Sequence, residues 1–269
     1  MNRKFISDSH IHSDNSSHAQ DPIIKICESA LALDLFSITI VDNCECDKYN
    51  EREYKKSLRQ LFFEAVKAQS IFKKNLNVLC GVELGQPHIN PSAAIDAIAS
   101  SDFDFILASI HRLKNLDNFL DIDYSDSNVY DVLDNYFNEV LDLIDWGNFN
   151  SLAHLNYPLK HLTGNLGIYV DSEKILKKVR LILEKLANKD KALEINTSIN
   201  SLSNSSILSN SNLLLEFKKL GGKYVTIGSG AHESDQLAFN VEETVKTLKE
   251  SGFSEFTVFK RRVPICLPI

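Results

Sequence analysis

The chain has 269 residues, of which 43% are hydrophobic and 24% are charged, which is ordinary for a globular protein with a large core. The net charge of −7 and the pI near 5.6 argue against a general nucleic-acid or membrane-surface binder, because both need a basic face. No apolar run of about 18 residues occurs, so we expect no membrane span. The first ten residues lack a signal-peptide core and the five cysteines are scattered, which favours the cytoplasm.

Short apolar segments alternate with longer segments of helical periodicity along the whole chain. We expect strands at eight places: Phe5–Ile11, Phe36–Val41, Val78–Leu84, Phe103–Ile110, Ser151–Leu155, Ala192–Ile195, Tyr224–Ile227 and Phe256–Phe259. Apolar residues at helical spacing predict helices over Val129–Ile144, Ile175–Leu186 and Leu213–Leu220. The stretch Ser201–Asn212 is rich in serine and asparagine, and we expect it to be a surface loop.

The alternation of strands and helices predicts βαβ units and a parallel sheet. No Pro/Gly-rich linker or change of composition divides the chain, so we expect residues 1–269 to form one domain. The sequence favours a closed α/β barrel or a distorted relative of one, since such barrels commonly have about 250 residues. The alternative is an open doubly wound sheet, but the glycine-rich nucleotide loops of that fold, GxGxxG or GxxxxGK[ST], are absent.

The histidine positions are the most informative feature of the sequence. Five of the eight histidines and one glutamate lie at or soon after the ends of predicted strands: His10, His12, Glu83, His111, His154 and His232. The C-terminal strand ends of a barrel meet at one rim, so these side chains should converge. Imidazole and carboxylate are the usual ligands of zinc, manganese and iron, and a carboxylate can bridge two ions.

Each of these residues taken alone is less informative than the set. A lone histidine at a strand end is more often a hydrogen-bonded surface residue, and only the complete set predicts a metal site. In His10-x-His12 the alternation of a strand places both rings on one face, where the pair can hold one ion. His88 and His161 fall outside the pattern and are assigned to the surface, and Cys44-x-Cys46 lacks the second cysteine pair of a metal site.

The segments around the strand ends form a recognisable set of motifs. They are Asp8–His12, Gly81–Gly85, Ala108–His111, Ala153–Asn156 and Gly228–His232. This set resembles the motifs of the PHP family, named for its polymerase and histidinol-phosphatase members. Lys191–Thr197 and Leu220–Thr226 add similarity to the histidinol-phosphatase branch, and the resemblance covers roughly residues 5 to 255.

The resemblance implies a distorted seven-stranded (β/α) barrel with a peripheral last strand, and a site where three metal ions bind phosphate and activate a bridging water. By position, His10, His12 and Glu83 would hold the first ion. Glu83 would bridge to a second ion held also by His111 and His154. His18 and His232 would hold the third. The cofactors expected are one to three divalent transition metal ions, which could be zinc, manganese or iron.

Two ligand positions depart from the family pattern. Gly230 stands where the family usually has Asp, and Asn43 stands where it has the His of a Thr-Asp/Glu-His triplet. The first and third ions would each lose one ligand, while the second keeps its set. Cys44 and Ser198 stand where histidinol phosphatases tend to carry Arg, and Asn156 stands where Asp is common.

The resulting hypothesis is a metal-dependent phosphomonoesterase, with L-histidinol phosphate as the substrate that the resemblance favours. Asp8 and His232 are the catalytic candidates, and Arg112 and Lys160 are candidate contacts to the phosphate or substrate, or equally solvated charges. Two alternatives stay open: a divergent paralogue that binds a ligand or partner without hydrolysis, and an enzyme with fewer ions and another substrate. The expected partner is a small phosphorylated substrate, not nucleic acid or a membrane, and the sequence does not predict an oligomeric state.

Overall fold

A computed structural model describes residues 6–114, 122–124, 128–199, 206 and 208–269 of the chain. Seven parallel strands form one sheet in chain order: β1 Ser7–Ile11, β2 Ser37–Glu45, β3 Asn77–Gly85, β4 Phe105–Ser109, β5 Ser151–Leu152, β6 Ala192–Asn196 and β7 Val225–Gly228. The His12 N–H donates to the Ala231 carbonyl at 2.9 Å and the Gly230 N–H to the His10 carbonyl at 2.8 Å, so β1 meets the segment after β7. The predicted distorted seven-stranded barrel is confirmed.

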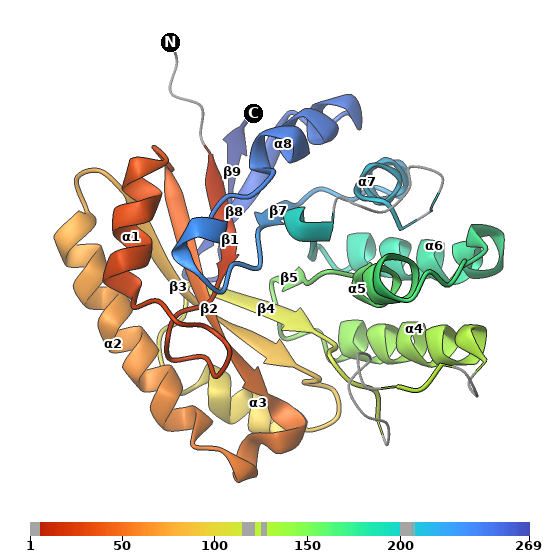
Figure 1. Cartoon of the computed structure of the whole chain (residues 1–269), viewed down its shortest axis with the longest axis horizontal. Coiled ribbons are helices and arrows are strands. Elements are labelled where there is room, and N and C mark those ends of the chain that lie inside the picture. The colour runs from red at the N-terminus through yellow and green to blue at the C-terminus, as the bar shows by residue number, and fades with distance from the viewer. Residues whose placement is uncertain (1–5, 115–121, 125–127, 200–205, 207) are drawn as a thin grey trace.

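Helices surround the strands, with α1 and α2 on one side of the barrel and α4 and α6 on the other (Figure 1). Their bounds are α1 Ile23–Ala32, α2 Tyr54–Phe72, α3 Pro91–Ile98, α4 Val129–Trp146, α5 Tyr157–Leu159, α6 Ser172–Asn188, α7 Asn210–Lys219 and α8 Val241–Glu250. The helix predicted from Val129 begins there because the Asn128 side chain accepts from the Tyr130 N–H, and it ends at Gly147, which takes the left-handed conformation.

The segment Phe256–Phe259, predicted as an eighth strand, does not join the parallel sheet. It lies in β8 (Glu255–Lys260), which pairs antiparallel with β9 (Val263–Pro268) in a separate two-stranded sheet. A hairpin is possible here because Arg261 and Arg262 form its turn, both with positive φ. The eighth predicted segment is therefore a strand outside the barrel sheet, as the implied peripheral last strand requires.

A small apolar cluster lies on the strand face that carries Glu83. Its members are Val41, Phe105, Leu107, Ala153, Ala192 and Phe259. The ring of Phe259, from the hairpin, stacks on Phe105 with centroids 5.3 Å apart. The larger cluster packs the other strand faces against the helices. The hairpin thus packs on the apolar layer of the barrel interior, and the opposite, C-terminal rim carries the polar side chains.

Half of the loop predicted over Ser201–Asn212 falls outside the described residues, which exclude 200–205 and 207. Its last part is helical, because the Ser209 hydroxyl caps α7 by accepting from the Asn212 N–H. Within the described ranges, none of the helices combines the length and apolar character that a membrane span needs.

Candidate metal centre

A cavity of 720 Å³ opens at the C-terminal rim of the barrel. Its walls contain nine of the ten residues singled out from the sequence: His10, His12, His18, Glu83, His111, Arg112, His154, Lys160 and His232. The remaining one, Asp8, lies deeper. The clustering at one rim follows from parallel strands, whose C-terminal ends all point the same way.

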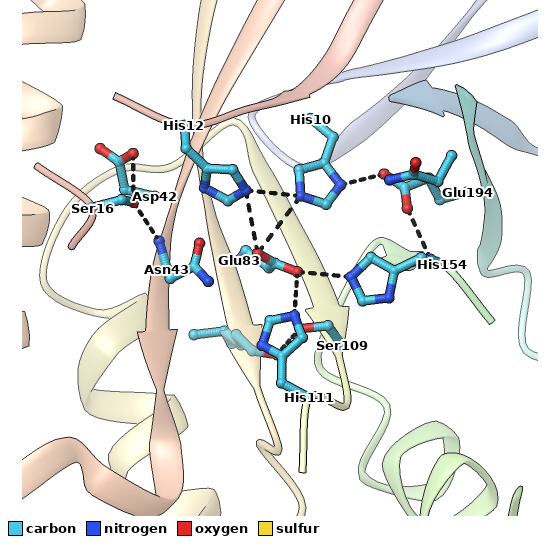
Figure 2. A network of polar contacts seen from close by, with 12 residues as sticks. His10, His12, Ser16, Asp42, Asn43, Glu83, Ser109, His111, His154 and Glu194 are labelled. Atoms are coloured by element: carbon cyan, nitrogen blue, oxygen red, sulfur yellow. Dashed lines mark hydrogen bonds and ion pairs between the residues drawn. The ribbon is translucent and has the colours of Figure 1, made fainter. Parts of the chain in front are cut away.

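Glu83 lies at the centre of four imidazoles (Figure 2). Its Oε1 is 3.2 Å from both the Nε2 of His111 and the Nε2 of His154. Its Oε2 is 3.6 Å from the Nε2 of both His10 and His12. The ligand atoms form two convergent groups, His10–His12–Glu83 and Glu83–His111–His154, which share the one carboxylate.

The geometry fits two bound ions. Ligands at zinc distances of 2.0–2.2 Å in a tetrahedron stand about 3.3 Å apart, close to the separations around Glu83. The two Nε2 atoms of His10 and His12 lie 3.1 Å apart and face each other. A cation between them would satisfy both lone pairs and the carboxylate. Both ligand groups therefore fit a bound divalent ion.

Glu194, on β6, supports both groups from behind. Its Oε1 lies 2.5 Å from the Nδ1 of His10, and its Oε2 accepts from the backbone N–H of His154 at 2.8 Å. His154 has a φ of 24°, an uncommon backbone conformation that this hydrogen bond helps to hold. Gly228 leaves room for the carboxylate, since a Cβ there would lie 2.5 Å from Glu194 Oε1 and would overlap the Cβ of His10.

Glu45, at the end of β2, supports His111 in the same way. Its Oε1 is 2.8 Å from the Nδ1 of His111, and its Oε2 accepts from the Nε2 of Gln86 at 2.7 Å. A carboxylate on one ring nitrogen holds the proton there and directs the other nitrogen to the ion. His10 and His111, one from each ligand group, both have this support.

Neighbouring charges in the inner site outweigh the effect of burial on the pKa values of His10 and Glu83. Burial alone lowers the pKa of His10, but Glu194 and Glu83 outweigh it and raise that pKa to about 10. Burial likewise acts against the carboxylate form of Glu83, yet His111 and His10 hold the pKa of Glu83 well below its usual range. Burial and the nearby His10 lower the pKa of His12. The carboxylates thus demand positive charge, which protons or divalent ions supply.

The residues implied for a third ion are less well gathered. His18 is exposed and His232 is half-buried, its ring stacked on His12 with centroids 4.5 Å apart. The Asn43 Oδ1 is buried and has no hydrogen-bond partner among the residues that the structure describes. Gly230 has a φ of 66°, so an Asp there would strain the backbone. Within the described residues, the convergent ligand groups do not include these four positions, and they do not fit a third ion as the inner groups fit two.

The two basic residues predicted to contact the substrate both reach the cavity. Arg112 makes an ion pair with Asp47, with 3.7 Å between Nε and Oδ2. The Lys160 ammonium donates to the Ser198 hydroxyl at 3.3 Å, and burial lowers the pKa of Lys160. Both residues line the same cavity as the two ligand groups.

Asp8 joins two segments of the barrel. Its carboxylate accepts from the backbone N–H and hydroxyl of Ser229, from the Ala238 N–H and from the His10 N–H. These bonds tie β1 to the segment after β7. Asp8 is not among the residues that line the cavity. Its hydrogen bonds within the described residues go to Ser229, Ala238 and the His10 backbone, so its catalytic role stays a prediction.

Two further predictions concern His88 and the pair Cys44 and Cys46. His88 was assigned to the surface, but its side chain is only 9% exposed and its Nε2 lies 3.2 Å from Glu139, so that assignment was wrong. Cys44 and Cys46 are buried free thiols.

Sequence reasoning missed Glu45, Gln86 and Glu194. The signal for Glu194 was a charged residue inside an apolar strand, Leu193-Glu194-Ile195. Glu45 lay beyond the predicted end of its strand, because β2 continues past Val41 to Glu45.

Comparisons with known proteins agree with the geometry. The PHP domain family matches residues 8–198. A histidinol-phosphatase from Lactococcus lactis is 27% identical over 256 residues, covering 94% of this chain and 93% of that protein. A protein from Thermotoga maritima named as a probable histidinol-phosphatase is 30% identical over 164 residues, covering 61% of this chain and 63% of that protein. The crystal structure of histidinol phosphate phosphatase from L. lactis, complexed with zinc, L-histidinol and phosphate, matches with a TM-score of 0.83 and 25% identity, covering 97% of this chain and 99% of that one.

Proposed function

Because the chain belongs to the PHP domain family, we propose that it is a metal-dependent phosphomonoesterase that converts L-histidinol phosphate and water to L-histidinol and phosphate. One observation carries the proposal: two metal-ligand groups share Glu83 on the floor of a cavity whose wall holds Arg112 and Lys160. The L. lactis relative, which is similar over almost the whole chain, was crystallised with zinc, L-histidinol and phosphate.

The proposed roles divide between the floor and the wall of the cavity. His10, His12 and Glu83 would hold one divalent ion, and Glu83, His111 and His154 a second. Bound ions would supply Lewis acidity toward the phosphoryl oxygens and lower the pKa of water.

The wall residues would position the substrate. Arg112 and Lys160 would bind the phosphate, with Arg112 offering planar N–H donors and Lys160 a point charge. Burial lowers the pKa of His232, which favours a neutral imidazole able to accept a proton from water or return one to the leaving alcohol. The cavity volume of 720 Å³ suits a small substrate.

The direct test combines metal analysis with phosphate release. Protein purified without chelator should contain zinc, manganese or iron, and metal-loaded protein should release phosphate from L-histidinol phosphate faster than from other small phosphomonoesters. Metal below about 0.3 ion per chain after reconstitution would refute the site. Full metal loading with no phosphate release would instead favour a divergent paralogue that binds without hydrolysis.

We also propose that residues 1–269 form a single domain working in the cytoplasm. The packing of Phe259, from the C-terminal hairpin, on Phe105 of the barrel strand β4 supports the first part. The five free cysteines support the second, since a reducing compartment keeps thiols free.

A further inference from the structure

A buried amide, Gln86, connects the ligand His111 to the basic residue Arg112. Gln86 follows β3, is 0% exposed and has a φ of 49°. Its Oε1 accepts from the backbone N–H of His111 at 2.7 Å and of Arg112 at 3.4 Å. Its Nε2 donates to Glu45 Oε2 at 2.7 Å and to Asp47 Oδ1 at 3.0 Å. The amide therefore uses both of its donors and both of its acceptor positions.

Two carboxylates, those of Glu45 and Asp47, extend this connection to the side chains of His111 and Arg112. Glu45 accepts from the Nδ1 of His111, while Asp47 pairs with the Nε of Arg112 at 3.7 Å. In the described part of the chain the Arg112 Nε has no hydrogen-bond partner, so this ion pair orients the guanidinium by charge. The path from ligand to arginine is thus continuous: His111, Glu45, Gln86, Asp47, Arg112.

We propose that Gln86 is a positioning residue that sets the tautomer of His111 and the direction of Arg112 together. With Glu45 held by Gln86, the proton of His111 stays on Nδ1 and Nε2 faces Glu83 as an ion ligand. With Asp47 held by the same amide, Arg112 points to the phosphate side of the cavity. The part that concerns Arg112 rests on the proposed function, and the part that concerns His111 rests on the ligand geometry.

The orientation of the amide is fixed by its partners. A flipped amide would place its oxygen against two carboxylates and its nitrogen against two backbone N–H groups. The variant Gln86→Glu keeps the shape of the side chain and replaces the donor nitrogen with an acceptor oxygen. It therefore tests the electrostatic role while leaving the volume of the buried site almost unchanged.

The experiment measures separately the effect of Gln86 on zinc binding, through Glu45 and His111, and on phosphate binding, through Asp47 and Arg112. Zinc affinity is measured by competition with a chromophoric chelator, and the affinity of the zinc-loaded protein for inorganic phosphate is measured by calorimetry. Glu45→Gln should lower zinc affinity by about 10–100-fold, with little change in phosphate affinity. Asp47→Asn should lower phosphate affinity with zinc affinity unchanged. Gln86→Glu should lower both.

The tautomer has its own readout. In protein with ¹⁵N-labelled histidine, His111 should show a protonated Nδ1, and Gln86→Glu and Glu45→Gln should redistribute that proton between the ring nitrogens. A purely structural role for Gln86 would lower the melting temperature without moving this signal. The matched control is Asn138→Ala, which removes an exposed amide between Asp134 and Lys178 and should change none of these quantities.

Folded Gln86→Glu with zinc affinity, phosphate affinity and the His111 signal all unchanged would overturn the proposal. If Gln86→Glu does not fold, Gln86→Ala takes its place with the same expectations. Wild-type protein that binds zinc and phosphate yet releases no phosphate from L-histidinol phosphate would refute the proposed function alone. The zinc and phosphate affinities of the wild type and the Gln86 variant would still decide the role of Gln86.

Discussion

The inner and outer halves of the cavity are built differently. In the inner half, four buried or nearly buried imidazoles surround Glu83, and two of them have a carboxylate on the ring nitrogen that points away from it. In the outer half, His18 is exposed and the buried Asn43 Oδ1 lacks a hydrogen-bond partner in the described ranges of the chain. Affinity for an ion depends on the groups that orient the ligands as well as on the ligands themselves. The difference indicates that the inner half fits two ions and that the outer half fits a third less well.

The largest effect is expected from removing an inner ligand. His154→Ala or His111→Ala should reduce phosphate release by more than about 100-fold, because each deletes a direct ligand and such a loss exceeds that of a supporting group. Circular dichroism should show an intact fold, and His161→Ala, an imidazole outside the cavity, is the control. Unchanged phosphate release in either variant would show that the chemistry lies in the other half.

A smaller effect is expected from the inner support. Glu194→Gln keeps the shape but removes the charge that faces His10, so zinc affinity should fall by about 10–100-fold in chelator competition. Glu139→Gln makes the same exchange at the carboxylate that pairs with His88, away from the cavity, and should leave zinc affinity unchanged. Equal losses in the two variants would count against a specific role for Glu194.

Substitutions that add metal ligands to the outer half should reduce the difference in metal binding between the two halves. Asn43→His should raise bound metal above two ions per chain by elemental analysis, because it adds an imidazole to the cavity wall that also contains His18 and His232. Gly230→Asp should help less, since the φ of 66° disfavours a side chain and its Cβ would lie 3.1 Å from Asn196 Nδ2. Folded Asn43→His protein with no additional metal would contradict the assignment of this position.

The smallest effect concerns the loop that carries His18. Asp21 binds Lys25 through its side chain and also accepts from the Ser234 N–H, and these bonds lower the pKa of Asp21 to about 2. A depressed folded-state pKa stabilises the fold above the ordinary value near 4, and this contribution disappears as the pH falls toward 2.

Asp21→Asn should therefore lower the free energy of unfolding at pH 6 by no more than about 1 kcal/mol. Denaturant titrations at several pH values should show the difference between wild type and variant shrinking between pH 4 and pH 2. A difference that stays constant over this range would mean that the charge of Asp21 is not what stabilises the loop.

The sequence predicts the inner ligands because they depend on two local facts, residue type and the end of a strand. Their supports depend on pairing across the barrel, as when Glu194 of β6 meets His10 of β1, and no local pattern reports that pairing. Alternation along a strand also predicts on which face a residue lies, but it does not predict how deep in the barrel the residue lies. Asp8 shares a face with His10, yet lies one layer deeper and binds Ser229 instead.

The hairpin shows the same limit at the other end of the barrel. Phe256–Phe259 has the apolar character of a barrel strand, and only its antiparallel pairing with β9 separates it from the others. That pairing depends on a turn made by two arginines, where the usual preference is for asparagine and glycine. The turn is fixed by tertiary bonds: the Arg261 N–H donates to Asp104, and Asn150 donates to the Arg262 carbonyl.

The close approach at Gly228 constrains how this protein can evolve. A Cβ at that position would overlap the Cβ of His10 as well as lie 2.5 Å from Glu194 Oε1, so the loss of Glu194 alone would not make room for a side chain. Gly228 therefore has to remain a glycine as long as β1 keeps its present place with a Cβ-bearing residue at position 10. A lineage can exchange Asn43 or Gly230 without disturbing the carboxylates behind the inner imidazoles. Replacing Gly228 instead requires that the backbones of β1 and β7 move apart.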